Sequence, residues 1–399
     1  DFSLRTDASS RFGKDNRWGA FWSVGLMWNL KKEKFLNECK WLTTTRLALS
    51  TGTSGNSDIG YYAWQSLVKG GMDYMGETGI YPAQSGNPDL SWEKTWTTNL
   101  ALHLGFWNRI NLDVELYNKK TTDMLMDVPQ SYAVNGSGSR WDNIGAMVNR
   151  GVEVMVNGDV IRTKNFSYNK NKITELYNGV DEYEIASTNL KYVVGRSSTE
   201  FYINRYAGVN PANGDALWYT KDGEITTEFR DSDKVMTGKS FVAPWQGGFG
   251  TTLTWKGISL AAQFSWVADR WVFNNDRYLD EGNGLFETYN QSRRLLYDRW
   301  KKPGDVTDIP RYGVTPQMDS RFLEDASFLR LKNLMLSYNF PQALLKKTNF
   351  LTHLRVFVQG QNLLTFTKFS GLDPEGVSNM YQAQYPSTRQ FTFGLEVSF

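Results

Sequence analysis

The stretch RQFTFGLEVSF, from Arg389 to Phe399, carries the pattern that decides the fold. Phe391, Phe393, Leu395, Val397 and Phe399 are apolar, and every residue between them is small or polar. This period-two alternation predicts a β-strand with one apolar face. Because the ends of soluble chains usually fray, a chain that stops on this apolar phase predicts a strand that is paired in a sheet.

The same alternation recurs along the chain and predicts about a dozen strands. Its clearest segments are 22–30, 99–106, 110–117, 249–255, 258–266, 334–340 and 354–358. Tight turns at Asn108-Arg109 and Lys256-Gly257 and short polar links near 31–40, 159–164 and 341–352 join alternate strand pairs. The other connections, about 52–91, 126–143, 174–245, 268–326 and 367–388, are long and show no strand pattern.

Short turns alternating with long loops are typical of an outer-membrane β-barrel, and such long structureless stretches are unusual in a compact soluble domain. Aromatic residues also gather near the predicted strand ends, where a membrane barrel carries its interfacial girdles. They are Trp22, Trp28, Phe106, Trp107, Trp255, Trp266 and Phe340. The sequence therefore predicts an all-β, transmembrane, antiparallel barrel as one domain over residues 1–399, with the long loops extracellular. A soluble β-sandwich is the alternative.

Composition narrows the remaining classes. Lys and Arg number 44 against 42 Asp and Glu, with no basic run, so nothing suggests nucleic-acid binding. The single Cys39 excludes an internal disulfide. Mean hydropathy is −0.48 and no run of about 18 apolar residues occurs, which excludes membrane-spanning helices. The chain begins within a strand-like segment, so we expect a fragment or a mature C-terminal portion, and the missing signal peptide carries no weight.

Motifs along almost the whole chain resemble the SusC/RagA family of TonB-dependent outer-membrane transporters. They are DASSRFGKDNRWGAFWSVGLMW (Asp7–Trp28), NPDLSWEKT (Asn87–Thr95), NRINLDVELYNKKTTDMLMDVP (Asn108–Pro129), NIGAMVNRGVEV (Asn143–Val154), YAGVNPANGDALWY (Tyr206–Tyr219), GGFGTTLTWKGISLAAQFSW (Gly247–Trp266), WKKPGDVTDIPRY (Trp300–Tyr312), LEDASFLRLKNLMLSYNFP (Leu323–Pro341), GQNLLTFTKFSGLDPE (Gly360–Glu375) and the terminal strand. Their order is that of the family.

The resemblance implies the C-terminal part of a 22-stranded barrel, with the plug domain and the TonB-contacting segment upstream. It also implies a multi-pass protein of the cell outer membrane, in contact with outer-membrane lipid. The implied partners are a SusD-like lipoprotein and TonB, which supplies the energy. An oligosaccharide is the cargo that the resemblance favours, and a peptide is the alternative. The family's terminal strand is the outer-membrane insertion signal, here Phe391, Phe393, Leu395, Val397 and Phe399. One stretch, Arg162–Leu176, departs from the family by about one strand, so residues are expected to be missing there.

The sequence offers little for catalysis, and we expect no enzyme and no cofactor. His103 and His353 are the only histidines, and structural hydrogen bonding is the expected role of each. No Gly-x-Ser-x-Gly elbow supports a barrel hydrolase, which stays as a third alternative. TGKS at Thr237–Ser240 lacks the first glycine of a phosphate loop. NPANGD (Asn210–Asp215) and DPEG (Asp373–Gly376) are interpreted as turns rather than calcium or other metal sites.

The predicted loops mix aromatic rings with amides and carboxylates, which can stack on sugars or peptide side chains and satisfy their polar groups. Packing within the loops or against a partner is an equally good explanation for each of these residues. The candidate substrate-binding residues are Tyr62, Trp64, Trp141, Trp218, Tyr219, Trp271, Asn275 and Asp276. The sequence thus predicts an importer of oligomeric nutrients, with a secreted β-sandwich that binds polysaccharide as the alternative from another class.

Overall fold

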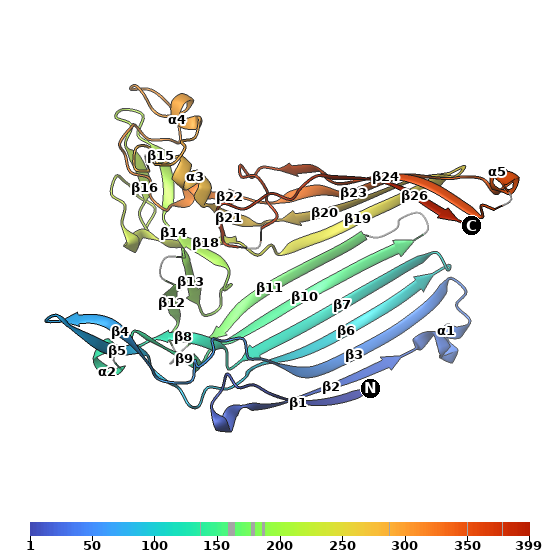
Figure 1. The fold of residues 1–399 in the computed structure, drawn as a ribbon, viewed down its shortest axis with the longest axis horizontal. Coiled ribbons are helices and arrows are strands. Elements are labelled where there is room, and N and C mark those ends of the chain that lie inside the picture. The colour runs from blue at the N-terminus through green and yellow to red at the C-terminus, as the bar shows by residue number, and fades with distance from the viewer. Residues whose placement is uncertain are drawn as a thin grey trace. The chain divides into compact units, whose positions relative to one another are not determined.

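A computed structural model describes residues 1–135, 137–158, 164–176, 180–185, 188–286, 288–348, 350–376 and 378–399. Its main element is an antiparallel sheet of twelve strands in the order β1-β2-β3-β6-β7-β10-β11-β19-β20-β23-β24-β26 (Figure 1). The strands are β1 (Phe2–Ala8), β2 (Trp18–Trp28), β3 (Leu42–Asn56), β6 (Glu93–Phe106), β7 (Ile110–Thr122), β10 (Ala146–Gly158), β11 (Lys164–Glu175), β19 (Trp245–Trp255), β20 (Ile258–Ala268), β23 (Phe328–Asn339), β24 (His353–Thr367) and β26 (Gln390–Ser398). The predicted all-β class and the predicted dozen strands are confirmed.

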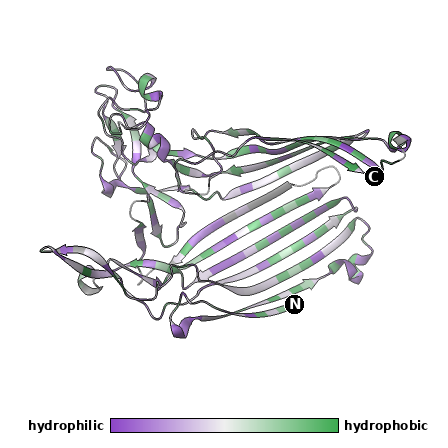
Figure 2. Cartoon of the chain, in the orientation of Figure 1, coloured by the Kyte–Doolittle hydropathy of each residue, from purple (hydrophilic) through white to green (hydrophobic). Residues whose placement is uncertain are grey.

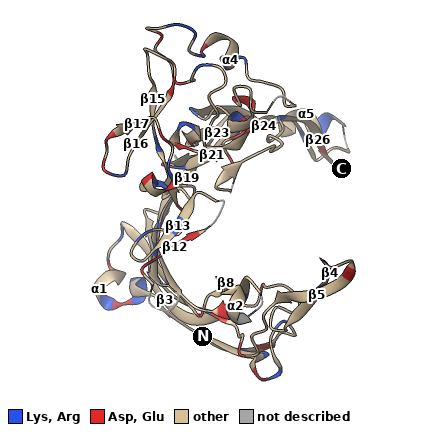
Figure 3. Ribbon diagram, turned by 90° about the vertical axis from the view of Figure 1, so that its left-hand side faces the viewer, with Lys and Arg blue, Asp and Glu red and all other residues tan. Residues whose placement is uncertain are grey.

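The connections at one end of these strands are short. Lys256 and Gly257 join β19 to β20 with positive φ angles of 45° and 86°, as a type I′ turn requires. Two of these connections are longer. The one from β2 to β3 contains η2 (Leu30–Lys32) and α1 (Lys34–Asn37), and the one from β23 to β24 contains α5 (Gln342–Leu345) and η6 (Lys346–Thr348). Lys and Arg are visible beside α1 and α5 in Figure 3. Of the predicted link at 159–164, residues 159–163 are not among those described, and neither are the first two residues of the Arg162–Leu176 stretch.

The apolar phase of the sheet is exposed, as strand β26 shows. Its Phe391, Phe393 and Leu395 side chains are 65%, 80% and 63% exposed. On the other phase Gly394 lies under the ring of Phe357, where an added Cβ would come within 2.1 Å of the ring. Hydrophobic and hydrophilic positions alternate along the strands in Figure 2. This arrangement is the reverse of a β-sandwich, in which the apolar phase forms the core, and it is the arrangement of a membrane barrel.

The chain divides into two compact units. The first comprises residues 1–154, 169–183 and 192–198, and the second comprises 155–168, 184–191 and 199–399. The first unit has a small core in which Phe12, Phe21 and Trp92 pack together. The second has a core around Phe201, Phe273 and Phe322, beside a smaller cluster of Val272, Ala326, Phe369 and Tyr381. Both units therefore contain ordinary buried cores as well as sheet strands.

The long connections contain regular structure, and the prediction that they are structureless was wrong. Their strands are β4 (Leu67–Tyr74), β5 (Glu77–Gln84), β8 (Leu125–Pro129), β9 (Ser139–Asn143), β12 (Glu182–Ile185), β13 (Leu190–Val193), β14 (Glu200–Ile203), β15 (Arg205–Val209), β16 (Ala216–Tyr219), β17 (Ile225–Thr226), β18 (Val235–Ser240), β21 (Trp271–Asn274), β22 (Leu323–Asp325) and β25 (Met380–Tyr381). These form small sheets of two to four strands. All but β4 and β5 have six residues or fewer, so no long run of alternation marks them.

A few short helices complete the connections. They are η1 (Lys14–Asn16), α2 (Tyr132–Asn135), η4 (Asp231–Asp233), α3 (Asn275–Asp280), α4 (Arg294–Tyr297) and η5 (Ser320–Phe322). No helix in the described ranges is long and apolar enough to cross a membrane. Helix α3, with six residues, is the longest α-helix in the described part of the chain, and several charged side chains lie around it.

Candidate functional site

Helix α3 starts where strand β21 ends. The Asn274 side chain accepts a hydrogen bond from the backbone N–H of Arg277 at 3.0 Å and so caps the helix. Asp276 and Asp280 are four residues apart and therefore share one face of the helix. The Asp276 carboxylate accepts from the backbone N–H of Ala383 at 2.9 and 3.1 Å, which ties α3 to the segment that follows β25.

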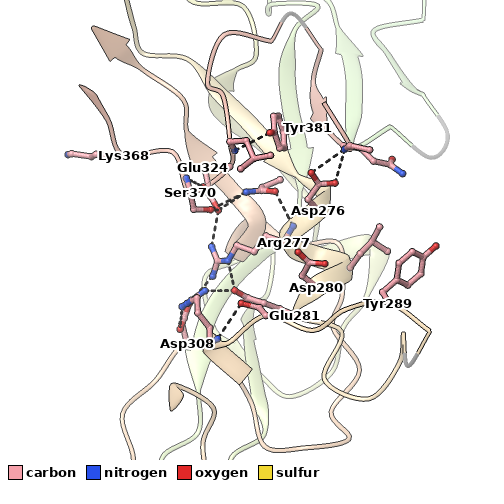
Figure 4. A pocket seen from close by; sticks show the side chains of 18 of the residues that line it. Asp276, Arg277, Asp280, Glu281, Tyr289, Asp308, Glu324, Lys368, Ser370 and Tyr381 are labelled. Atoms are coloured by element: carbon pink, nitrogen blue, oxygen red, sulfur yellow. Dashed lines mark hydrogen bonds and ion pairs between the residues drawn. The ribbon is translucent and has the colours of Figure 1, made fainter. Parts of the chain in front are cut away.

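Arg277 of α3 and Arg294 of α4 are held by a network of carboxylates. Arg277, Glu281, Asp308 and Glu324 of this network are labelled in Figure 4. Arg277 donates to Glu281 at 2.8 Å, to Asp308 at 3.0 Å and to Glu324 at 3.1 Å. Arg294 donates to both oxygens of Asp308 at 2.8 and 2.9 Å and also to Glu281. The N–H donors of a guanidinium lie in one plane and point in fixed directions, so these pairings hold both arginine side chains in place.

A cavity of about 890 Å³ opens beside this network within the second unit. The charged residues that line it are Asp276, Arg277, Asp280, Glu281, Arg294, Asp308, Glu324, Asp325 and Lys368. Tyr289 and Leu372 are exposed apolar or aromatic side chains in the same lining. Carboxylates outnumber cations in this wall, and both arginines are engaged by the network described above. Asp276, Asp280 and Tyr289 lie around one part of the cavity (Figure 4).

The electrostatics of the cavity agree with an excess of negative charge. Burial raises the pKa of the Asp280 carboxyl, and the neighbouring carboxylates of Asp276 and Glu281 raise it further. Burial acts the same way on Asp308, but its hydrogen bonds and charge pairing with Arg294 outweigh burial and hold its pKa below the ordinary value. A cationic group placed between Asp276 and Asp280 would relieve their repulsion. The cavity is therefore suited to a ligand with an amine or guanidinium.

Three of the predicted site residues lie in the first unit. Tyr62 is exposed with a positive φ of 64°. Trp64 and Trp141 pack against the core that contains Phe12 and Trp92. The carbonyl of Trp141 accepts from the Asn87 side chain at 3.0 Å. The structure therefore places two of these three rings in loop packing.

The other five predicted residues lie in the second unit. Trp218 is buried and its indole donates to Asp319 at 2.7 Å, while Tyr219 lies under the guanidinium of Arg205. Trp271 packs below the Lys239 ammonium, which lies 3.6 Å from the ring centroid, and Asn275 is buried in α3. Of the eight predicted residues, Asp276 is the one that lines the described cavity.

Sequence reasoning missed most of the charged residues around Asp276. Arg277, Asp280 and Glu281 lie in the predicted long connection 268–326, and the carboxylates of Asp276 and Asp280 at the i and i+4 positions were the available signal. Arg294 and Asp308 lie further along the chain, and no spacing in the sequence indicates that they meet Glu281.

Three of the residues considered for catalysis or metal binding, His103, Asp215 and Asp373, form other contacts. His103 on β6 faces Asp113 on β7, with 2.6 Å between Nδ1 and the carboxylate. Asp373 of the DPEG stretch binds Arg330, and Asp215 of NPANGD binds Arg311. Within the described part of the chain, no group of three or more His, Cys, Asp or Glu side chains is arranged to hold a metal ion.

An antiparallel sheet with an exposed apolar phase and structured long connections defines the class of membrane β-barrels. Residues 1–363 match the family described as TonB dependent receptor-like, beta-barrel. The chain belongs to this family, and its resemblance to SusC/RagA proteins is confirmed.

Several relatives match the full chain. The chain is 31% identical to TonB-dependent receptor SusC of Bacteroides thetaiotaomicron and 30% identical to TonB-dependent receptor P3 of Formosa agariphila, covering 100% of this chain and 42% and 44% of those proteins. Among solved structures, the RagAB peptide transporter is 38% identical with a TM-score of 0.88 over 100% of this chain and 45% of that chain. The chain thus spans less than half the length of these relatives.

Proposed function

We propose that this chain is part of an outer-membrane importer of oligomeric nutrients that works with a SusD-like surface lipoprotein and is energised through TonB. The observation that carries the proposal is the match of residues 1–363 to the TonB-dependent barrel family, on a sheet whose apolar phase is exposed. The long connections are extracellular in this proposal, the polar phase of the sheet lines the passage, and no chemical step occurs.

Oligopeptides are the cargo that we propose, although the sequence alone favoured glycans. The chain is more similar to the RagAB peptide transporter, at 38% identity, than to SusC, at 31%. The acidic cavity beside α3 also suits the amino groups and basic side chains of peptides, which neutral sugars lack. In this proposal Asp276 and Asp280 contact the cargo.

The test of active import uses cells that express the full-length protein with its lipoprotein partner. Deleting the TonB-contacting segment of the full-length protein should abolish uptake of a labelled oligopeptide and leave its binding at the cell surface unchanged. Uptake that survives the deletion would contradict TonB-driven import.

The test of cargo compares a lysine-rich peptide, a neutral peptide and a neutral oligosaccharide in the same cells. The double substitution D276N/D280N should weaken binding of the lysine-rich peptide about ten-fold, because it removes two charges from the cavity. Binding of the neutral peptide should change little. The matched control, D89N/D222N, removes two exposed carboxylates that do not line the cavity. Stronger binding of the oligosaccharide than of either peptide would support the glycan importer instead.

A further inference from the structure

The short turns of the first unit have a common composition. The connection from β2 to β3 carries Lys32, Lys34 and Lys40, and the turn from β6 to β7 carries Arg109. All four side chains are exposed, and within the described residues none of them forms an ion pair. Lys31 differs, because its ammonium donates to three carbonyl oxygens of the same connection and so belongs to the turn itself.

The short turns of the second unit repeat this composition. Lys256 lies in the turn between β19 and β20, and Lys346 and Lys347 lie in η6 between β23 and β24. These three lysines are exposed, and the ammonium of Lys256 lies 5.1 Å from the ring centroid of Trp255. The long connections 57–92, 123–145, 176–244 and 269–327 have the opposite balance, since each holds more acidic than basic residues. The connection 368–389 is balanced, with two residues of each sign, and the β1–β2 connection 9–17 is basic. The short turns therefore differ in charge from these four long connections.

Exposed aromatic rings accompany the cations in both units. In the first, Trp41 stacks on Phe106 with 5.9 Å between ring centroids and also contacts Trp107. In the second, Phe350 stacks on the terminal Phe399 at 6.1 Å. Trp41, Trp107, Phe350 and Phe399 are all more than half exposed. Aromatic rings of this kind lie at the boundary between lipid chains and headgroups, and nearby Lys and Arg side chains extend into the headgroup layer.

We infer that the short-turn end of the sheet binds the headgroups of anionic phospholipids. The phosphate groups of the membrane leaflet nearest the short turns would pair with the exposed cations, which are Lys32, Lys34, Lys40, Arg109, Lys256, Lys346 and Lys347. The exposed aromatic rings would lie in the headgroup layer beside these cations. A neutral headgroup carries the same phosphate but also a cationic group, which weakens its attraction to a cluster of lysines. This inference rests on the proposed insertion of the protein in a membrane.

The experiment titrates the full-length protein in detergent with phosphatidylglycerol or with phosphatidylcholine of the same chain length. Native mass spectrometry gives the apparent affinity for each lipid. The wild type should bind phosphatidylglycerol more tightly than phosphatidylcholine. The variant K40Q/R109Q/K256Q/K347Q neutralises one cation in each of the four short turns named above, and it should lose about ten-fold of the affinity for phosphatidylglycerol. Binding of phosphatidylcholine should stay unchanged in this variant.

The control variant K69Q/K221Q/K301Q/K302Q removes the same number of exposed cations from the long connections. It should bind phosphatidylglycerol as the wild type does. Equal binding of both lipids by the wild type would overturn the lipid inference but not the membrane barrel. An equal loss of phosphatidylglycerol affinity in the control variant would do the same. A full-length protein that needs no detergent and shows no heat-modifiable gel mobility would instead overturn the membrane barrel, and the inference with it.

Discussion

Two phenylalanines in the second unit show how differently the chain treats its apolar residues. Phe322, next to strand β22, is 0% exposed and packs edge-on against Phe273 and Tyr278. Phe393 on β26 is 80% exposed, and Phe391 and Leu395 on the same phase are 65% and 63% exposed. A water-soluble protein minimises the second kind of surface, whereas a protein in lipid has no reason to bury it. The comparison indicates that the sheet and the connections fold against two different solvents.

Charged residues follow the same division. Arg330 is on the sheet strand β23, yet it is 3% exposed because the segment 368–389 folds over it. Its guanidinium donates to Asp373 and Glu375, each at 2.5 Å, and to Thr365 at 2.9 Å. Burial alone would raise the pKa of Asp373, but Arg330 and backbone N–H donors hold it below its ordinary value. This cluster joins the sheet to a long connection.

The largest expected effect is the loss of this join. In R330M the buried Asp373 carboxylate loses its paired cation, while Glu375 keeps the Lys332 ammonium at 2.6 Å. The loss should lower the free energy of unfolding by roughly 3–5 kcal/mol. A denaturant titration of the full-length protein in detergent measures it, and limited proteolysis should show new cleavage within 368–389. The matched control is R230M, because Arg230 and its partner Glu228 are both exposed and their pair should contribute nothing measurable. Equal stability of R330M and the wild type would contradict the structural role of the cluster.

The next effect separates the two faces of one strand. An arginine in place of Phe393 should destabilise the protein in a phospholipid bilayer by about 2–4 kcal/mol, because it puts a charge on the lipid face. An arginine at the adjacent Thr392, which is on the other phase, should cost much less. Folding equilibria of F393R and T392R in the same vesicles measure the difference. If T392R were the more damaging substitution, the assignment of the lipid face would be reversed.

The sheet was predictable from the sequence, and the cavity mostly was not. Phe391, Phe393 and Leu395 are two residues apart, so a local rule is enough to assign their common face. The turn at Lys256-Gly257 has the same local character. Both features depend on neighbours in the chain, and each is where the alternation predicts it.

The sites depend on contacts between distant residues. Trp218 was selected as a candidate substrate-binding residue, but its indole N–H donates to Asp319, which is 101 residues away in sequence. Arg294 meets Glu281 and Asp308 because α4 and the segment after it fold back onto α3. No periodicity reports such contacts. Loop composition therefore indicated the right region, around Asp276, and not the set of side chains that form the cavity.

The smallest effect is a pH dependence within the loop core. Asp319 is buried beneath Trp218, and burial raises its pKa to about 6, above the ordinary value of 3.8. Because the folded-state pKa is the higher one, the neutral carboxyl favours folding. That contribution is complete below about pH 4 and is lost as the pH rises through about 6. The free energy of unfolding should therefore fall by on the order of 2 kcal/mol from this group across that window.

The substitution D319N isolates this contribution. Asparagine is neutral at every pH and its side-chain oxygen can still accept the N–H of Trp218, so D319N should flatten the decline between pH 4 and 7. Denaturant titrations at several pH values, on the full-length protein in detergent, compare the slopes. Asp373 acts with the opposite sign, since its lowered pKa makes its contribution disappear as the pH falls, so D373N should leave the decline through pH 6 in place. An unchanged slope in D319N would show that the buried carboxyl beside Trp218 is already ionised in the folded protein at pH 4.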